Sequence, residues 1–102
     1  MRYVYLMRND ETGRYKIGIS KDPTKRLEQL QTGNDGDLVL INQFKSEYST
    51  KIETAMQNSY SHTRKRGEWF DIHLEEEQLF ISECIKIEKN IKYLLESGNI
   101  FI

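Results

Sequence analysis

The chain of 102 residues suits a single domain, 1–102, with a real but modest hydrophobic core. Its 37% hydrophobic and 30% charged residues are typical of a folded globular protein and exclude a disordered one. The composition also excludes a membrane-spanning helix and an intrachain disulfide, because no apolar run is long enough and Cys84 is the only cysteine. The start of the sequence lacks the pattern of a signal peptide, so we expect an intracellular, cytoplasmic location.

The net charge of −1 is unevenly distributed along the chain. Residues 1–72 contain 12 Lys and Arg against 10 Asp and Glu, whereas residues 73–102 contain 3 against 6. A nearly neutral total predicts weak non-specific affinity for nucleic acids. The basic excess of the first segment nevertheless allows a local phosphate-binding face.

The first elements predict a β-hairpin. Residues 2–7 and 14–20 alternate in polarity and are rich in Tyr, Val and Ile, which indicates two strands. Residues 9–13 have turn chemistry. We expect the loop to close around residues 10 and 11.

That loop predicts a particular register for the two strands. Tyr5 is expected opposite Lys16, and Tyr3 opposite Gly18. Because side chains alternate between faces, Tyr5 and Lys16 then share one face of the sheet. We expect Gly18 beside them to leave a gap for a backbone or a ligand, and the other face to be apolar and covered by helices.

A helix and a third strand are predicted next. Asp22-Pro23 has the chemistry of a helix start, Leu27 and Leu30 form one apolar face, and Thr32-Gly33 ends the helix. Residues 38–44 form a third strand, whose nearly continuous apolar start predicts a central position in the sheet.

The remaining chain predicts further helices and one short extended segment. Ser49 or Thr50 is expected to cap a second helix that carries Glu53 in its first turns. Its inner face is predicted at Ile52, Met56, Ser59 and Tyr60. Residues 68–72 are expected to form a short strand or extended edge. A C-terminal helix over about 75–96 has its inner stripe at Phe80, Cys84, Ile87, Ile91 and Leu94.

Together these elements predict an α+β fold, a small α/β sandwich. A three-stranded antiparallel sheet is flanked by helices in the order β-β-α-β-α-(β)-α.

Four polar side chains on separate elements suggest chemistry at phosphate. Phosphodiester hydrolysis needs a deprotonated water, neutralised phosphoryl oxygens and a stabilised leaving oxygen. A phenol accepts a proton more readily when cations lie nearby, and a carboxylate holds a divalent metal. The residues with these functional groups are Tyr5, Lys16, Arg26 and Glu53.

Each residue taken alone also has a structural interpretation. Tyrosine is common in strands, surface lysine and arginine are usually solvated, and a glutamate in a first helical turn favours the helix dipole. Trp69 and Phe70 are more readily interpreted as core residues than as a platform for stacking bases. His62 and His73 lack the spacing of metal ligands.

The combination resembles the GIY-YIG nuclease family, whose members have two motif strands in a hairpin, an arginine on the next helix and a glutamate after the third strand. The segment 67–70, Gly-Glu-Trp-Phe, is similar to a divergent phage and bacterial branch whose second motif is Lys-Ile-Gly. The resemblance covers about residues 2–72. The matching residues are Tyr3-Val4-Tyr5, Lys16-Ile17-Gly18, Arg26 and Glu53.

The resemblance implies a metal-dependent endonuclease that cuts DNA by direct attack of water, with little sequence specificity of its own. Tyr5 is then the general base, Arg26 stabilises the phosphate, and Glu53 binds Mg²⁺, with Mn²⁺ as a substitute. Lys16 stands in the place of the second motif tyrosine and orients the nucleophile or binds phosphate. Gln57 departs from the histidine common in this branch. The residues expected to contact DNA are Arg14, Lys25, Arg64, Lys65 and Arg66.

Two other interpretations stay open from the sequence. One is a catalytically inactive member of the same fold that binds DNA or a protein partner. The other is an interaction protein that uses the C-terminal helix, whose spacing also suits a weak homodimer in place of a monomer.

Overall fold

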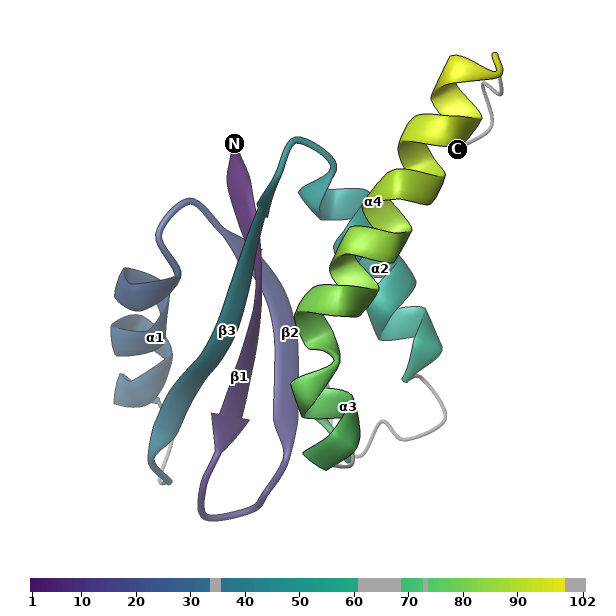
Figure 1. Ribbon diagram of the computed structural model, residues 1–102. Coiled ribbons are helices and arrows are strands. Elements are labelled where there is room, and N and C mark those ends of the chain that lie inside the picture. The colour runs from purple at the N-terminus through teal and green to yellow at the C-terminus, as the bar shows by residue number, and fades with distance from the viewer. Residues whose placement is uncertain (34–35, 61–68, 73, 99–102) are drawn as a thin grey trace.

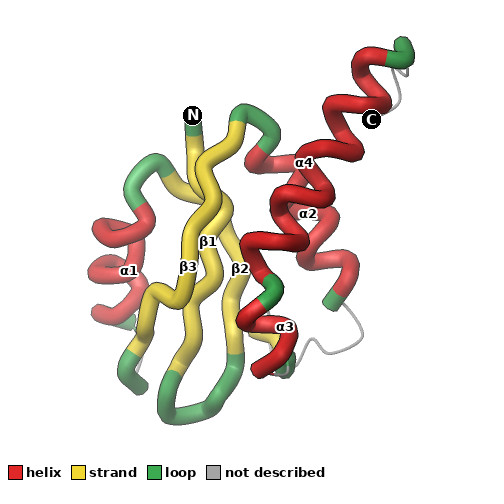
Figure 2. The backbone as a smooth tube through the Cα atoms, in the orientation of Figure 1, coloured by secondary structure: helices red, strands yellow, loops and turns green. Residues whose placement is uncertain are grey.

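The computed structural model describes residues 1–33, 36–60, 69–72 and 74–98. Four strands form an antiparallel sheet in the order β3-β1-β2-β4, with α1 on one face and α2, α3 and α4 on the other (Figure 1, Figure 2). This arrangement confirms the predicted α+β class and adds a fourth strand to the sheet. The elements are β1 (Arg2–Asn9), β2 (Tyr15–Ser20), α1 (Pro23–Thr32), β3 (Leu38–Ser46), α2 (Ser49–Ser59), β4 (Trp69–Phe70), α3 (Leu74–Gln78) and α4 (Phe80–Glu96).

The hairpin of β1 and β2 forms as predicted, but its expected register is wrong by two residues. Tyr5 lies opposite Gly18 rather than Lys16, and Lys16 lies opposite Met7. A shift of two residues keeps every side chain on its predicted face, since a strand repeats every two residues. Tyr5, Lys16 and Gly18 therefore still share one face.

The turn residues explain the shift in register. The side-chain carbonyl of Asn9 accepts hydrogen bonds from the backbone N–H of Glu11 and Thr12, and the Asn9 N–H donates to Arg14 O. Gly13 has a φ of +73°, a conformation that favours glycine. Two more residues therefore separate Tyr5 from the residue that faces it on β2 than the predicted turn allows. As a result Gly18, rather than Lys16, lies opposite Tyr5.

The third strand lies at an edge of the sheet, so its predicted central position is wrong. β3 pairs with β1 alone, and β1 and β2 are the central strands. Along β3 only Leu38 and Ser46 are buried. The apolar run at its start reflects packing on both faces of the strand, against α1 on one and α4 on the other, and Ile41 packs against the main core. At the α1 end, the Gln31 side chain donates to Gly36 O and accepts from Leu38 N–H.

The main hydrophobic core lies between the sheet and the pair α2 and α4. Apolar side chains of β1 and β2 that point away from Tyr5 pack there against both helices. Within α2 the predicted inner residues Ile52, Met56 and Tyr60 are buried, whereas Ser59 is exposed. The buried cluster comprises Val4, Leu6, Tyr15, Ile17, Ile52, Met56, Tyr60, Phe70, Phe80, Cys84 and Ile91.

Helix starts agree with the sequence in one case and differ in the other. α1 begins as predicted, with Pro23 in its first turn and the Asp22 carboxylate accepting from Lys25 N–H at 3.1 Å. α2 begins after Tyr48, which makes no side-chain capping bond, so the predicted caps at Ser49 or Thr50 are wrong.

The predicted C-terminal helix is divided into α3 and α4 at Leu79. Phe80, the first residue after the break, is buried in the core. Glu77, before the break, faces the hairpin, where its carboxylate accepts from Arg8 at 2.6 Å and from the Tyr15 hydroxyl at 2.7 Å. The apolar stripe continues through the break, so periodicity alone predicts one continuous helix.

Candidate active site

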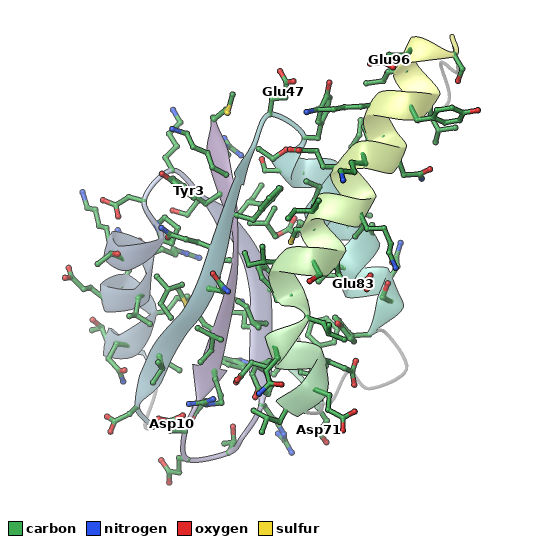
Figure 3. The ribbon with its side chains drawn as sticks, viewed as in Figure 1. Tyr3, Asp10, Glu47, Asp71, Glu83 and Glu96 are labelled. Carbon is green, nitrogen blue, oxygen red and sulfur yellow. The ribbon has the colours of Figure 1, made fainter. Side chains whose placement is uncertain are left out.

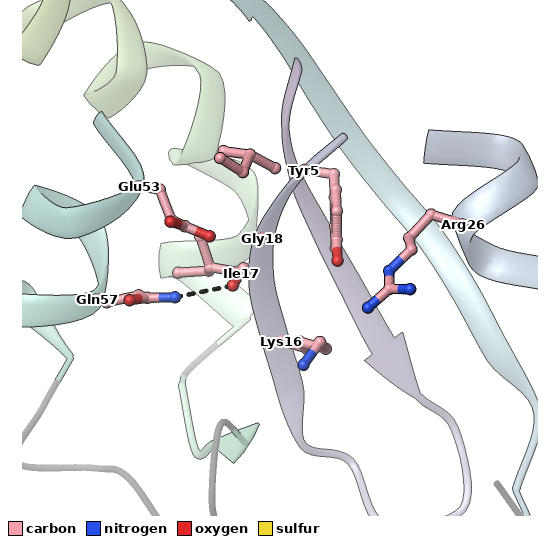
Figure 4. Close-up of a pocket in the computed structure, with 8 residues that line it drawn as sticks. Tyr5, Lys16, Ile17, Gly18, Arg26, Glu53 and Gln57 are labelled. Atoms are coloured by element: carbon pink, nitrogen blue, oxygen red, sulfur yellow. Dashed lines mark hydrogen bonds between the residues drawn. The ribbon is translucent and has the colours of Figure 1, made fainter. Parts of the chain in front are cut away.

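A cleft of about 190 Å³ opens where β2 meets α1 and α2. It brings together all four of the side chains for which the sequence suggested chemistry, although they come from four different elements (Figure 4). The residues that line it are Tyr5, Lys16, Ile17, Gly18, Ile19, Arg26, Glu53 and Gln57.

Tyr5 occupies the gap expected beside Gly18. A methyl group added at Gly18 would lie 2.5 Å from Tyr5 Cζ and 3.0 Å from Tyr5 Cε2. Tyr5 is only 2% exposed, so the ring is held by its surroundings with the phenol end at the cleft. The space beside Gly18 is therefore filled by the Tyr5 ring and is not open to a backbone or a ligand.

Lys16 is held from the neighbouring strand. Its side chain is only 8% exposed, and Nζ lies 5.9 Å from the centroid of the Trp69 ring on β4. An aromatic face attracts an ammonium group and limits the positions of the flexible lysine chain. β4 thus contributes to the cleft through Lys16, although Trp69 is not among the residues that line it.

Arg26 reaches the cleft from the first turn of α1. The helix start fixes its backbone, since Arg26 N–H donates to Asp22 O at 3.0 Å. The side chain is exposed, and Nη1 lies 3.5 Å from Gln29 Oε1. Figure 4 shows its guanidinium group directed toward Tyr5 and Lys16. An exposed planar fork of this kind suits a phosphate group that arrives from solvent.

Glu53 and Gln57 reach the cleft from α2, one helical turn apart. β4 pairs with β2 only at Tyr15 and Lys16, so the β2 edge continues beyond it. Gln57 Nε2 donates to Ile17 O at 3.0 Å, taking the next carbonyl along that edge (Figure 4). This hydrogen bond joins α2 to β2 beside Gly18. Because Glu53 is on the same helix, the bond also helps to position Glu53 at the cleft.

The side chains at the cleft suit an Mg²⁺ ion that keeps several waters better than a metal ion held by protein ligands alone. The described part of the chain has no group of three or more His, Cys, Asp or Glu that would hold an ion. Among the described residues that line the cleft, Glu53 is the one that supplies a carboxylate. Mg²⁺ is commonly held by one or two carboxylates while it keeps several waters and substrate phosphates, so a single carboxylate is compatible with it.

Several predicted DNA contacts lie away from the cleft or outside the described residues. Lys25 is exposed on α1, next to Arg26 but not lining the cleft. Arg14 lies at the hairpin tip, 3.9 Å from Asp71. The segment with Arg64, Lys65 and Arg66 lies outside the described residues, as do His62, Glu68 and His73.

Two buried groups with a raised pKa, the Cys84 thiol and the Tyr15 phenol, are not among the residues that line this cleft. Burial raises the pKa of the Cys84 thiol to about 12, which excludes a reactive thiolate near neutral pH. Burial also raises the pKa of Tyr15, whose hydroxyl donates to Glu77. These groups are part of the core and of the hairpin anchor, and we assign them no chemistry.

One residue that lines the cleft has no role in the sequence-based hypothesis. Gln57 was noted as a departure from a related pattern, yet the structure gives it a bond to β2 and a place in the cleft. The available signal was its spacing of four residues from Glu53, which puts both on one face of a helix.

The protein is a small α+β domain in which a phenol, two cationic side chains and a carboxylate lie around one cleft. A family model, the T5orf172 domain, matches residues 2–89. The chain therefore belongs to the T5orf172 domain family, a phage-associated domain that is loosely linked to nuclease-type domains. The match includes every residue that lines the cleft.

No curated protein and no solved structure matches the chain. In the described ranges, no helix combines the length and the apolar character needed to cross a membrane.

Proposed function

We propose that the protein is a metal-dependent endonuclease of the GIY-YIG type that hydrolyses DNA phosphodiester bonds with little intrinsic sequence specificity. The observation that supports this most directly is the convergence of Tyr5, Lys16, Arg26 and Glu53 on one cleft. These residues span 49 positions of the sequence, from 5 to 53, and the family match covers all of them.

Each side chain has a role that follows from its place. The Tyr5 phenolate accepts a proton from the attacking water, whose oxygen forms a bond to phosphorus as the bond to the leaving oxygen breaks. Arg26 binds non-bridging phosphate oxygens through its planar fork. Lys16, held beside Trp69, supplies a second positive charge at the phosphate.

Glu53 would hold the divalent metal, with its remaining positions filled by water and phosphate oxygen. When bound, such an ion neutralises charge on the phosphoryl group and stabilises the leaving oxygen. Gln57 orients this part of the site by fixing α2 against Ile17. We expect Mg²⁺ to act here, with Mn²⁺ as a substitute.

The proposal is tested with supercoiled plasmid and branched DNA, each incubated with Mg²⁺, with Mn²⁺ or with EDTA. Wild type should nick or cut with either metal and not with EDTA, and Glu53→Gln should lose at least about a hundredfold in rate. Glu28→Gln makes the same change of charge at an exposed residue of α1 that does not line the cleft, and this variant should cleave as wild type does. Folded wild type that cleaves nothing would favour the alternative, an inactive domain that binds DNA or a protein.

A further inference from the structure

Two aromatic rings on the cleft side of the sheet each have a lysine ammonium over one face. Lys45 Nζ lies 5.8 Å from the centroid of the Tyr3 ring, and Lys16 Nζ lies 5.9 Å from that of Trp69. Both pairs join partners on neighbouring strands, β1 with β3 and β2 with β4. Tyr3 and Trp69 are both partly exposed.

The strand register places Gly18 midway between the two rings. Tyr3 lies two residues along β1 from Tyr5, which is opposite Gly18. Trp69 lies opposite Lys16, which is two residues along β2 from Gly18 in the other direction. Each ring is thus one strand and two residues from Gly18, roughly 8 Å away on a regular sheet.

All of these side chains share one face. Cross-strand partners project to the same side of a sheet, and so do residues two apart on one strand. Tyr3, Tyr5, Lys16 and Trp69 therefore project to the side of the sheet where α1 lies. Figure 3 shows Tyr3 near the N-terminal end of β1, above α1 in that view.

We propose that the two pairs bind the nucleotides that flank the phosphate at Tyr5, with one unpaired base stacked on Tyr3 and another on Trp69. This inference rests on the proposed function, because it takes the cleft as the position of the phosphate. Lys45 and Lys16 meet the phosphates of the same strand. The diagonal from Tyr3 across Gly18 to Trp69 is the path of that strand.

The chemistry of stacking defines the substrate class. Base–aromatic stacking tolerates any base, because every base has a flat face, but the face must be free of its neighbours in a duplex. The site therefore fits single-stranded DNA, including the unpaired strand of a flap or branch. It also agrees with low sequence specificity, since no hydrogen bonds to base edges are needed.

Trp69 is the only tryptophan, so its fluorescence reports directly on one of the two stacking positions. Wild type in EDTA, where no cleavage is expected, is titrated with a short single-stranded oligonucleotide, with a blunt duplex of that sequence, and with an abasic strand of equal length. The single strand should quench the fluorescence saturably and bind about tenfold more tightly than the other two.

Tyr3 provides the second test, at the other end of the path. Tyr3→Leu removes the ring and should weaken single-strand binding about tenfold, whereas Tyr3→Phe should bind as wild type does. Tyr93→Leu is the matched control, because Tyr93 is 68% exposed on α4, away from the sheet face. Thermal unfolding of all three variants shows whether each is folded.

Unchanged single-strand affinity in folded Tyr3→Leu would overturn the inference, and so would equal quenching by the abasic strand or tighter binding of the duplex. If Tyr3→Leu does not fold, the comparison of intact and abasic strands on wild type decides. A protein that cuts plasmid without preferring the single strand would retain the proposed function and lose this inference. A protein that binds the single strand through both rings but cuts no DNA would retain this inference and lose the proposed function.

Discussion

The phenol of Tyr5 lies across Gly18 of the neighbouring strand, in space that any larger side chain would enter. Tyr5 is buried apart from its approach to the cleft, so the ring has little room to move aside. The position of the proposed general base therefore depends on the absence of a side chain at residue 18. This relationship gives the glycine a physical role in the site that is independent of turn conformation.

Gly18→Ala should displace the Tyr5 ring and strongly reduce cleavage. The added methyl overpacks a buried site, which typically costs ~1–3 kcal/mol in the free energy of unfolding. Gly33→Ala is the control, because its nearest contact would be Leu30 O at 3.9 Å. Plasmid cleavage and urea unfolding of the two variants test this. Wild-type cleavage by a folded Gly18→Ala protein would show that the Tyr5 position does not matter.

Tyr5→Phe and Tyr15→Phe should separate activity from stability. The first removes the hydroxyl at the cleft and should abolish cleavage while the protein stays folded. The second removes the hydroxyl that donates to Glu77 at 2.7 Å, so it should cost ~1–2 kcal/mol of stability and leave cleavage intact. Both variants are compared by cleavage rate and by the midpoint of urea unfolding. Loss of cleavage in folded Tyr15→Phe, with full cleavage by Tyr5→Phe, would contradict the assignment.

Gln57→Leu should lower cleavage and weaken the apparent affinity for Mg²⁺. The leucine cannot donate to Ile17 O, so α2 and with it Glu53 lose their tie to the open edge of β2. We expect a roughly tenfold loss, in line with residues that orient metal ligands. The measurement is cleavage rate against Mg²⁺ concentration, with Gln78→Leu on exposed α3 as the control. An unchanged Mg²⁺ dependence would remove Gln57 from the site.

The Cys84 thiol should be unreactive and should link stability to alkaline pH. Burial raises its pKa from 9.0 to about 12, so the folded state holds the thiol proton more tightly than the unfolded state. The stabilisation is therefore complete below pH 9 and is lost as the pH rises from 9 toward 12. Alkylation at pH 8 should be slow in native protein and rapid in urea, and Cys84→Ala should flatten the loss of stability above pH 9. Fast native alkylation would contradict this burial.

Ile91 and Leu95 should respond very differently to truncation, although both are apolar residues of α4. Ile91 is 5% exposed and packs in the core, so Ile91→Ala should cost ~2–4 kcal/mol. Leu95 is 44% exposed, and Leu95→Ala should change stability by less than ~0.5 kcal/mol. Charging Ile91 would therefore unfold the domain. Leu95→Lys, followed by sedimentation, is the suitable test of a weak homodimer through α4.

Most elements of this fold could be predicted from local sequence. Alternation marked β1 and β2, the Asp22-Pro23 pair marked the start of α1, and the apolar stripe marked α4. The strand register was missed because it depends on how Gly13 and Asn9 close the turn, which composition does not define. The edge position of β3 is not predicted because helices pack on both faces of this strand, which produces an apolar run at an edge as well as in the centre of a sheet.

The sequence predicts the four main residues of the candidate site but not the contacts that position them. Tyr5, Lys16, Arg26 and Glu53 were expected together, and they do line one cleft. The contacts of Gln57 with Ile17 and of Lys16 with Trp69 depend on where β4 ends along β2, which is a tertiary feature. Their roles in catalysis stay predictions.

The most direct test of a single active site is a double-mutant cycle of Tyr5→Phe and Glu53→Gln, measured as the rate of plasmid nicking in Mn²⁺. Residues that act in one chemical step show strongly non-additive losses. We predict that each variant alone loses most of the activity and that the double variant is no slower than the worse single variant. Two small losses that simply add, or wild-type rates in either single variant, would contradict a common catalytic site for these two residues.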